Sequence, residues 1–294
     1  MAQTLKAYQA RQENPKDISA AYAFCFDLAA SHYENFPVAS NLISPKLRKH
    51  VACLYGFARI ADDFSDEPEY EGVRRERLLE WRDNLKSLNQ KTPAHPVFIA
   101  LKETLKDLHL PVQPFDDLLD AFLQDTVKSR YQNFDEVLDY CRRSANPVGR
   151  IVLMIHGYRE EELFKLSDSI CTGLQLANFW QDISVDLKKD RIYIPQEDFT
   201  RFSYSEADLR MGVVNERFRD LMKFEISRVC QIFEQGQSLP QKLSWPLSWE
   251  IRLTLLGGRQ ILKKIRKQNY NTLNQRPTLS KWDWIPLLLR AVLK

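Results

Sequence analysis

Four acidic side chains gather in the stretch FARIADDFSDE, from Phe57 to Glu67, and their spacing could support metal-ion chemistry. Tyr55, Arg59, Asp62 and Asp66 fall at offsets of 0, 4, 7 and 11, which is one narrow stripe if the segment is helical. Like charges at this spacing repel each other, so Asp62 and Asp66 need solvent or a cation to relieve them. The opposite stripe is apolar, and an ordinary amphipathic surface helix would look the same.

A second polar stripe lies in CTGLQLANFWQDISVDLKKDRIYIP, from Cys171 to Pro195. Gln175, Asn178, Asp182 and Asp186 fall at offsets of 0, 3, 7 and 11, on a helix that is otherwise apolar almost all round. If this helix is buried, its carboxylates and amides lie inside the protein and need a counter-charge, because burying unpaired charge is too costly.

Two carboxylate pairs of this kind could hold hard cations through oxygen ligands. Magnesium fits best, since it takes one or two carboxylates and completes its coordination with water and phosphate oxygens. The five histidines and five cysteines form no zinc-binding spacing. Arg59 and Arg191 are suited to phosphate charge, so the expected ligand is a diphosphate. There is no GxxxxGK[ST] loop, which argues against a common nucleoside triphosphatase.

The elements that must position these side chains are helices. Only 9 glycines occur among 294 residues, and apolar residues recur at spacings of three and four. No linker or composition shift divides the chain, so we expect one all-α domain over 1–294, with an N-terminal tail of about 1–17 and a C-terminal segment of about 271–294. The expected helices are about 18–34, 46–66, 71–89, 95–108, 113–128, 134–142, 146–156, 160–186, 205–235 and 248–269.

Charge and cysteine content restrict the partners and the compartment. A net charge of +3 does not indicate a nucleic-acid-binding protein. Dispersed cysteines, with no signal peptide or spanning segment, predict a cytoplasmic protein. The end of the chain, RPTLSKWDWIPLLLRAVLK, resembles an interfacial anchor that would touch the inner face of the membrane peripherally. A last helix packed on the core is an equal alternative.

Three motifs together, DDFSD, YCRRSANPVG and NFWQDISVDLKKDRIYIP, resemble the squalene and phytoene synthase family. The resemblance runs from about Ser31 to Tyr270 and implies an isoprenoid synthase fold, with helices around a central cavity. Within the family, HYENFPVASNLISPKLRKHVACLYGFARIADDFSDE is most similar to the bacterial hopanoid-pathway branch.

The resemblance also implies roles for individual residues. In this family the two aspartate motifs hold several Mg²⁺ ions on the diphosphate, and the implied metal ligands are Asp62, Asp66, Asn178, Asp182 and Asp186. Tyr55 and Tyr140 match catalytic tyrosines near the reacting carbons, beside the four aspartates. The implied substrate-binding residues are Arg59, Gln175, Asn178, Arg191, Tyr193, His32, Tyr33, Asn35 and Phe36.

The expected reaction converts presqualene diphosphate and water to hydroxysqualene and diphosphate, in squalene and hopanoid biosynthesis, without NADPH. One departure from the wider family favours this branch: Gln181 stands before Asp182, where enzymes that join two prenyl diphosphates usually carry arginine. Two alternatives stay open. The chain could condense two prenyl diphosphates to presqualene diphosphate, squalene or a phytoene-type product, or it could be a non-catalytic helical assembly factor, because fold alone does not guarantee chemistry. Neighbouring enzymes of the squalene pathway are the expected protein partners.

Overall fold

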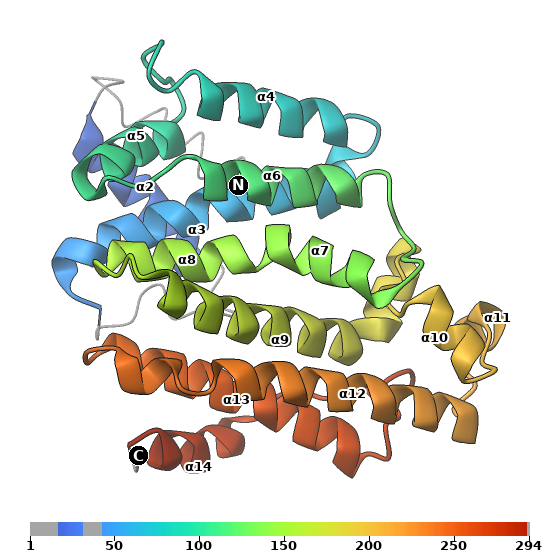
Figure 1. Cartoon of the computed structure of the whole chain (residues 1–294). Coiled ribbons are helices and arrows are strands. Elements are labelled where there is room, and N and C mark those ends of the chain that lie inside the picture. Colours follow the sequence, from blue (N-terminus) through green and yellow to red (C-terminus); the bar gives the residue numbers. More distant parts are fainter. Residues whose placement is uncertain (1–16, 32–42, 293–294) are drawn as a thin grey trace. The chain divides into compact units, whose positions relative to one another are not determined.

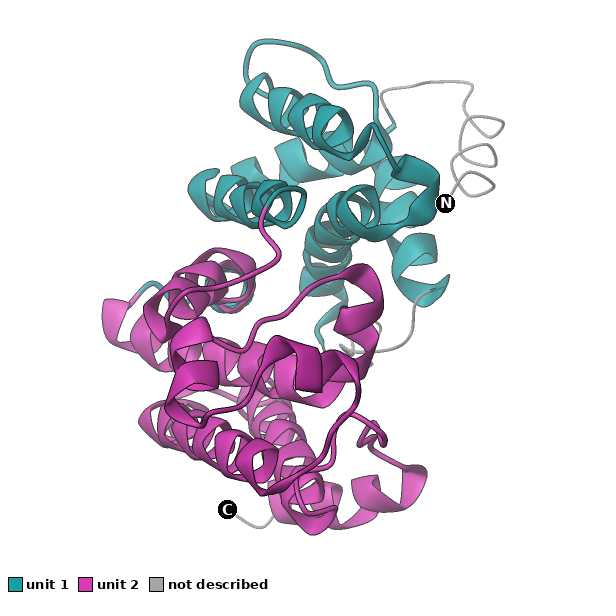
Figure 2. Ribbon diagram, turned by 90° about the vertical axis from the view of Figure 1, so that its right-hand side faces the viewer, with its two compact units in different colours: residues 1–127, 150–159 teal, residues 128–149, 160–294 magenta. Residues whose placement is uncertain are grey.

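The computed structural model describes residues 17–31 and 43–292, and these residues form helices joined by turns and loops, without a strand (Figure 1). The all-α prediction is confirmed. Contacts divide the chain into two compact units, residues 1–127 with 150–159 and residues 128–149 with 160–294 (Figure 2). The single domain over 1–294 therefore stays a prediction. None of the described helices combines the length and the apolar content needed to cross a bilayer.

The first unit is built around the helix that carries the first acidic stripe. Its helices are α2 (Ile18–Ser31), α3 (Pro45–Asp66), α4 (Arg74–Lys86), α5 (Pro96–Leu108) and α6 (Gln113–Asp125). Proline in the first turn suits α3, because its missing N–H would have no partner there. Phe57 of α3 is fully buried, with its ring centroid 5.3 Å from that of Phe115 and 6.0 Å from those of Trp81 and Phe98. This packing fixes the apolar side of α3 and leaves its polar stripe on the other side.

The second unit is built around α9, which packs against α7, α12 and α13. Its helices are α7 (Phe134–Ser144), α9 (Glu161–Asp186), α10 (Gln196–Arg201), α11 (Glu206–Arg210), α12 (Glu216–Gly236), α13 (Leu247–Lys267) and α14 (Lys281–Val292), while α8 (Asn146–Ile155) is shared between the units. A Cβ atom on Gly173 would lie 2.6 Å from the ring of Phe233, so α9 and α12 approach closely only because this residue is glycine.

One expected helix is wrong: 205–235 is two helices, α11 and α12. Gly212 has a φ of +69° in the turn between them. The Asn215 side chain caps α12 by accepting a hydrogen bond of 3.0 Å from the backbone N–H of Phe218. Asparagine is a preferred residue at this position, so the sequence did carry a boundary signal that the apolar periodicity masked.

A buried ion cluster joins α10 to α12. Asp198 and Glu225 are both fully buried, and Nη2 of Arg228 donates to each carboxylate at 2.5 Å. The Arg228 guanidinium also lies over the ring of Phe134, 3.8 Å from its centroid. Burial, the largest influence, raises the pKa of Glu225 to about 8. Glu225 is therefore mostly protonated in the folded protein at neutral pH.

This raised pKa predicts a pH dependence of stability. The folded protein holds the Glu225 proton up to about pH 8, whereas the unfolded chain releases it near 4.5, so the free energy of unfolding should fall by a few kcal/mol as pH rises through this interval. The glutamine in Glu225→Gln cannot ionise. Urea denaturation should therefore show that the free energy of unfolding of this variant depends less on pH, and that above pH 8 the variant is more stable than the wild type. The exposed Glu234→Gln on the same helix is the control. Parallel pH profiles for wild type and Glu225→Gln would contradict a protonated Glu225.

Candidate active site

The first polar stripe lies on one face of α3, as predicted. Tyr55, Arg59, Asp62 and Asp66 are all half-buried there. Arg59 also contacts acids that were not expected to pair with it: its Nη2 lies 2.6 Å from Oδ1 of buried Asp63 and 3.7 Å from Oε1 of Glu67. Its Nη1 lies 3.6 Å from Oδ2 of Asp62.

These contacts decide the charge state of the arginine. Burial lowers the pKa of Arg59, but the carboxylates of Asp63 and Asp62 outweigh this effect and raise it. Arg59 therefore keeps its charge and balances the acids of its own helix. The signal for Asp63 was its spacing of four residues from Arg59, which places both side chains on one side of a helix.

The second polar stripe lies on α9, and it is more accessible than expected. Gln175, Asp182 and Asp186 are half-buried and Asn178 is exposed, whereas the opposite faces bury residues such as Leu176 and Trp180. The stripe is therefore partly accessible rather than fully buried, and the side chain of Asp182 is 13% exposed. Water reaches the stripe, so its charges cost less than buried charges would.

Asp182 nevertheless has a counter-charge. Arg276 pairs with it through two hydrogen bonds, one of them 3.1 Å from Nη2 to Oδ2. The neighbouring Gln181 donates from Nε2 to the backbone carbonyl of Pro277 at 2.8 Å. Sequence reasoning missed Arg276, which lies 94 residues from Asp182 in a loop without periodicity. A cation bound at Asp182 would have to share the carboxylate with the Arg276 guanidinium or displace it.

The loop after α9 brings three predicted residues to one small pocket. Asp186, Arg191 and Tyr193 line it, together with apolar residues of α9 and of the loop. The Tyr193 ring stacks on that of Phe179, with centroids 3.6 Å apart, and lies 5.8 Å from the ring of Tyr140 on α7. Predicted residues Tyr140 and Tyr193 therefore share one buried aromatic cluster.

Tyr131 belongs to the same cluster and was missed. It is fully buried, with its ring centroid 5.6 Å from that of Tyr193 and 6.0 Å from that of Tyr140. The only available signal was an aromatic residue within the polar run KSRYQNFDE, between two helices.

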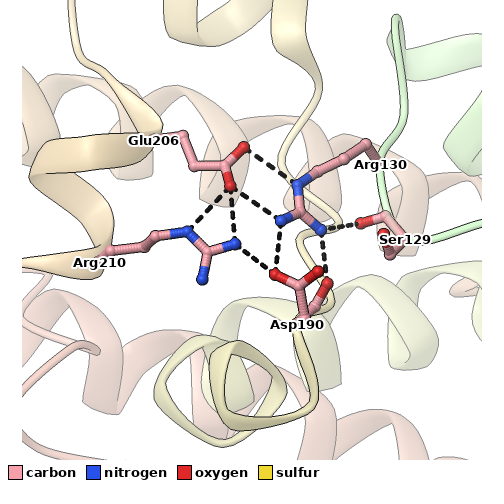
Figure 3. Close-up of polar contacts among 5 residues, drawn as sticks. All are labelled: Ser129, Arg130, Asp190, Glu206 and Arg210. Carbon is pink, nitrogen blue, oxygen red and sulfur yellow. Dashed lines mark hydrogen bonds and ion pairs between the residues drawn. The ribbon is translucent and has the colours of Figure 1, made fainter.

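A cluster of four charged residues holds the loop in place (Figure 3). This Arg130 clamp consists of Arg130, Asp190, Glu206 and Arg210. Arg130 binds Glu206 in a forked pair, with Nε to Oε2 at 3.0 Å and Nη2 to Oε1 at 2.8 Å, and donates to the Asp190 backbone carbonyl at 2.5 Å. Arg210 bridges Glu206 and the Asp190 carboxylate. A forked arginine–carboxylate pair restricts direction as well as distance.

The clamp acts on the backbone next to Arg191. Asp190 has a φ of +56°, and Ile192, two residues further on, donates its N–H to the Ser129 carbonyl at 3.0 Å. Hydrogen bonds from Arg210 and then Arg130 lower the pKa of Asp190 to about 2, so it stays ionised at any physiological pH. The clamp thus connects the loop that carries Arg191 and Tyr193 to the segment that carries Tyr131.

Removing the clamp should therefore impair catalysis more than stability. Arg130→Gln is expected to lower kcat about tenfold or more, because small displacements of binding groups are costly, with little change in thermal midpoint. Arg130→Lys should restore only part of the rate, since a lysine cannot make the forked pair. Arg142→Gln, which removes an exposed arginine of α7, is the control. Equal loss of rate in Arg130→Gln and Arg142→Gln would contradict a positioning role.

His32, Tyr33, Asn35 and Phe36 lie outside the described residues. The α3 stripe belongs to the first unit, while Tyr140 and the α9 stripe with its loop belong to the second. Within residues 17–31 and 43–292, no group of three or more His, Cys, Asp or Glu side chains could hold a metal by itself. Paired aspartates still suit Mg²⁺, which takes one or two carboxylates and obtains its other ligands from water and phosphate.

Comparisons with known proteins agree with the motifs. The squalene/phytoene synthase family model matches residues 29–283. A phytoene synthase from Arthrospira platensis is 32% identical over 294 residues, covering 94% of this chain and 95% of the relative. A 15-cis-phytoene synthase from Synechocystis is also 32% identical, over 290 residues, covering 93% of this chain and 86% of the relative.

Solved structures show the same fold. The crystal structure of squalene synthase HpnC from Alicyclobacillus acidocaldarius is 37% identical with a TM-score of 0.82, covering 86% of this chain and 96% of that one. A dehydrosqualene synthase structure is 21% identical with a TM-score of 0.84, over 95% of this chain and 98% of that one, and shares the fold. The chain therefore belongs to the squalene/phytoene synthase family, whose enzymes process prenyl diphosphates.

Proposed function

We propose that the protein is a hydroxysqualene synthase, which converts presqualene diphosphate and water to hydroxysqualene and diphosphate. The observation that carries this proposal is the accessible face of α9, where Asp182 and Asp186 share a stripe with Gln175 and Asn178. Gln181 supports the narrower assignment, because its amide binds the Pro277 carbonyl and supplies no positive charge for a second diphosphate. The 37% identity to a structure named squalene synthase HpnC supports a squalene-type, thirty-carbon product.

The diphosphate is the part of the substrate that the polar residues would bind. Asp62, Asp66, Asn178, Asp182 and Asp186 would hold Mg²⁺, which when bound supplies positive charge to the leaving diphosphate. Arg59 and Arg191 would bind diphosphate oxygens directly through planar guanidinium groups. On this proposal His32, Tyr33, Asn35 and Phe36 are further contacts of the diphosphate.

The carbon skeleton would react beside the aromatic residues. Departure of the diphosphate leaves a cyclopropylcarbinyl cation, which rearranges to an allylic cation. Water captures this cation and loses a proton, so the product oxygen comes from water and no hydride donor such as NADPH is consumed. On this proposal the aromatic rings of Tyr55, Tyr140 and Tyr193 attract the cation.

A second candidate is an enzyme that condenses two prenyl diphosphates. The observation that favours it is the naming of the two 32% identical relatives as phytoene synthases. The third alternative is an assembly factor without catalysis. Membership of an enzyme family argues against it.

Location belongs to the same proposal. We place the protein in the cytoplasm, in peripheral contact with the inner face of the membrane and beside neighbouring enzymes of the squalene pathway. A thirty-carbon apolar product supports this placement, because such a product partitions into lipid.

Product analysis tests the proposal. The purified protein with Mg²⁺ is incubated separately with presqualene, farnesyl or geranylgeranyl diphosphate, without nicotinamide, and the extracts are analysed by gas chromatography with mass detection. Hydroxysqualene from presqualene diphosphate is the expected result. Condensation of farnesyl or geranylgeranyl diphosphate would favour the second candidate, and no product from any substrate would overturn both.

A further inference from the structure

Helix α14 exposes an apolar stripe to solvent. Trp282 is 80% exposed, Ile285 51% and Leu289 61%. Their offsets of 0, 3 and 7 place them on one face of the helix. Trp284 and Leu288, each 40% exposed, widen this face. Such a group of large apolar side chains on one surface indicates an interaction site rather than scattered surface residues.

The opposite face of α14 is already packed. Leu287 and Ala291 are buried. Near the start of α14, Asp283 accepts hydrogen bonds from Lys264 Nζ at 2.6 Å and Gln260 Nε2 at 3.2 Å. Near its end, Arg252 Nη1 donates to the Ala291 carbonyl at 3.1 Å. Packing on the core therefore accounts for one face, and the contacts to α13 fix the helix with its second apolar face outward.

The segment that carries α13 and α14 is rich in basic residues. Between Leu247 and Val292 the chain has nine lysines and arginines but only two acids, although the whole chain carries only +3. One of the acids, Glu250, is buried, and the other, Asp283, is paired with Lys264. The exposed cations of α13 and α14 are Lys263, Arg266, Lys267, Lys281 and Arg290.

We propose that α14 lies on an anionic lipid surface, with Trp282, Ile285 and Leu289 in the boundary between headgroups and acyl chains. Tryptophan is enriched at this boundary, and basic residues near it are attracted to anionic headgroups. A protein partner could use the apolar stripe as well, but it would not need the excess of positive charge along α13. This inference stands apart from the proposed reaction, because binding to vesicles is measured without turnover.

Vesicle co-sedimentation of the full chain tests this proposal. The chain should bind vesicles that contain about one third phosphatidylglycerol at least tenfold more tightly than pure phosphatidylcholine vesicles, and added salt should weaken the binding. The double variant Trp282→Gln/Leu289→Gln should lose about tenfold or more of the binding to anionic vesicles. Trp245→Gln removes a tryptophan that is 72% exposed outside α14, and it should bind as the wild type does.

Three results would overturn the proposal. Absence of binding to anionic vesicles would remove the lipid surface as partner. Equal binding to neutral and anionic vesicles would remove the role of the basic residues. Self-association in sedimentation velocity that the double variant abolishes, without vesicle binding by the wild type, would assign the stripe to a second copy of the chain.

Discussion

Replacing Asp186 by asparagine is expected to lower kcat about 100- to 1000-fold and to raise the Mg²⁺ concentration needed for half-maximal rate. Asparagine keeps the shape of the side chain and one oxygen ligand, but it loses the negative charge that would hold a cation. Asp186 lines a small pocket together with Arg191, so on the proposed function the charge is lost beside a residue that would bind the diphosphate. Steady-state rates over a range of Mg²⁺ concentrations, with the substrate identified by product analysis, measure both effects.

Two comparisons make this experiment specific. Asp220→Asn removes an exposed carboxylate from α12 and should leave the rate unchanged. Asp62→Asn should likewise lower kcat and raise the Mg²⁺ concentration needed for half-maximal rate, because it removes a carboxylate of the first motif. An Asp186→Asn enzyme with full activity and unchanged Mg²⁺ dependence would refute the proposed role of the second motif.

Helix positions were largely predictable, because helical periodicity and local signals decide most of them. Helix α3 was expected at 46–66 and spans Pro45–Asp66, and α9 was expected at 160–186 and spans Glu161–Asp186. Buried apolar faces produce this periodicity directly. The break at Gly212 was missed because α11 and α12 are both apolar on one side, so the pattern continues across the turn. Short α10 lacks the length that makes periodicity visible.

The site was predictable where it depends on helical spacing and unpredictable where it depends on loops. Asp182 and Asp186 could be placed on one face of α9 from their offsets alone. Arg276, Tyr131 and the Arg130 clamp could not be found this way, because their partners are distant in sequence and the loops that carry them have no repeat. The burial of the polar residues on α9 could not be judged from the sequence either. The apolar residues around them showed that the helix is packed, but not which face stays open.

The largest expected effect on stability comes from Arg228, whose guanidinium binds the buried carboxyl groups of Asp198 and Glu225 at 2.5 Å, whereas exposed Arg201 lies 3.6 Å from Asp198. Arg228→Met should lower the free energy of unfolding by about 3–5 kcal/mol, because Asp198 would keep a buried charge without its main partner. Methionine retains an unbranched apolar stem that can still pack against Phe134 and Phe224, so most of the loss should be electrostatic. Urea denaturation monitored by circular dichroism measures the change.

Compensating substitutions separate charge from packing in this cluster. Adding Asp198→Asn and Glu225→Gln to Arg228→Met removes all three buried ionisable groups and leaves only exposed Arg201 nearby, so most of the lost stability should return. Lys223→Met removes an exposed cation from the same helix and should change the free energy of unfolding by less than about 0.5 kcal/mol. If the triple variant is as unstable as Arg228→Met alone, the lost free energy of unfolding comes from the packing of the guanidinium against the aromatic rings. The charges of the cluster would then not be the main source of its stability.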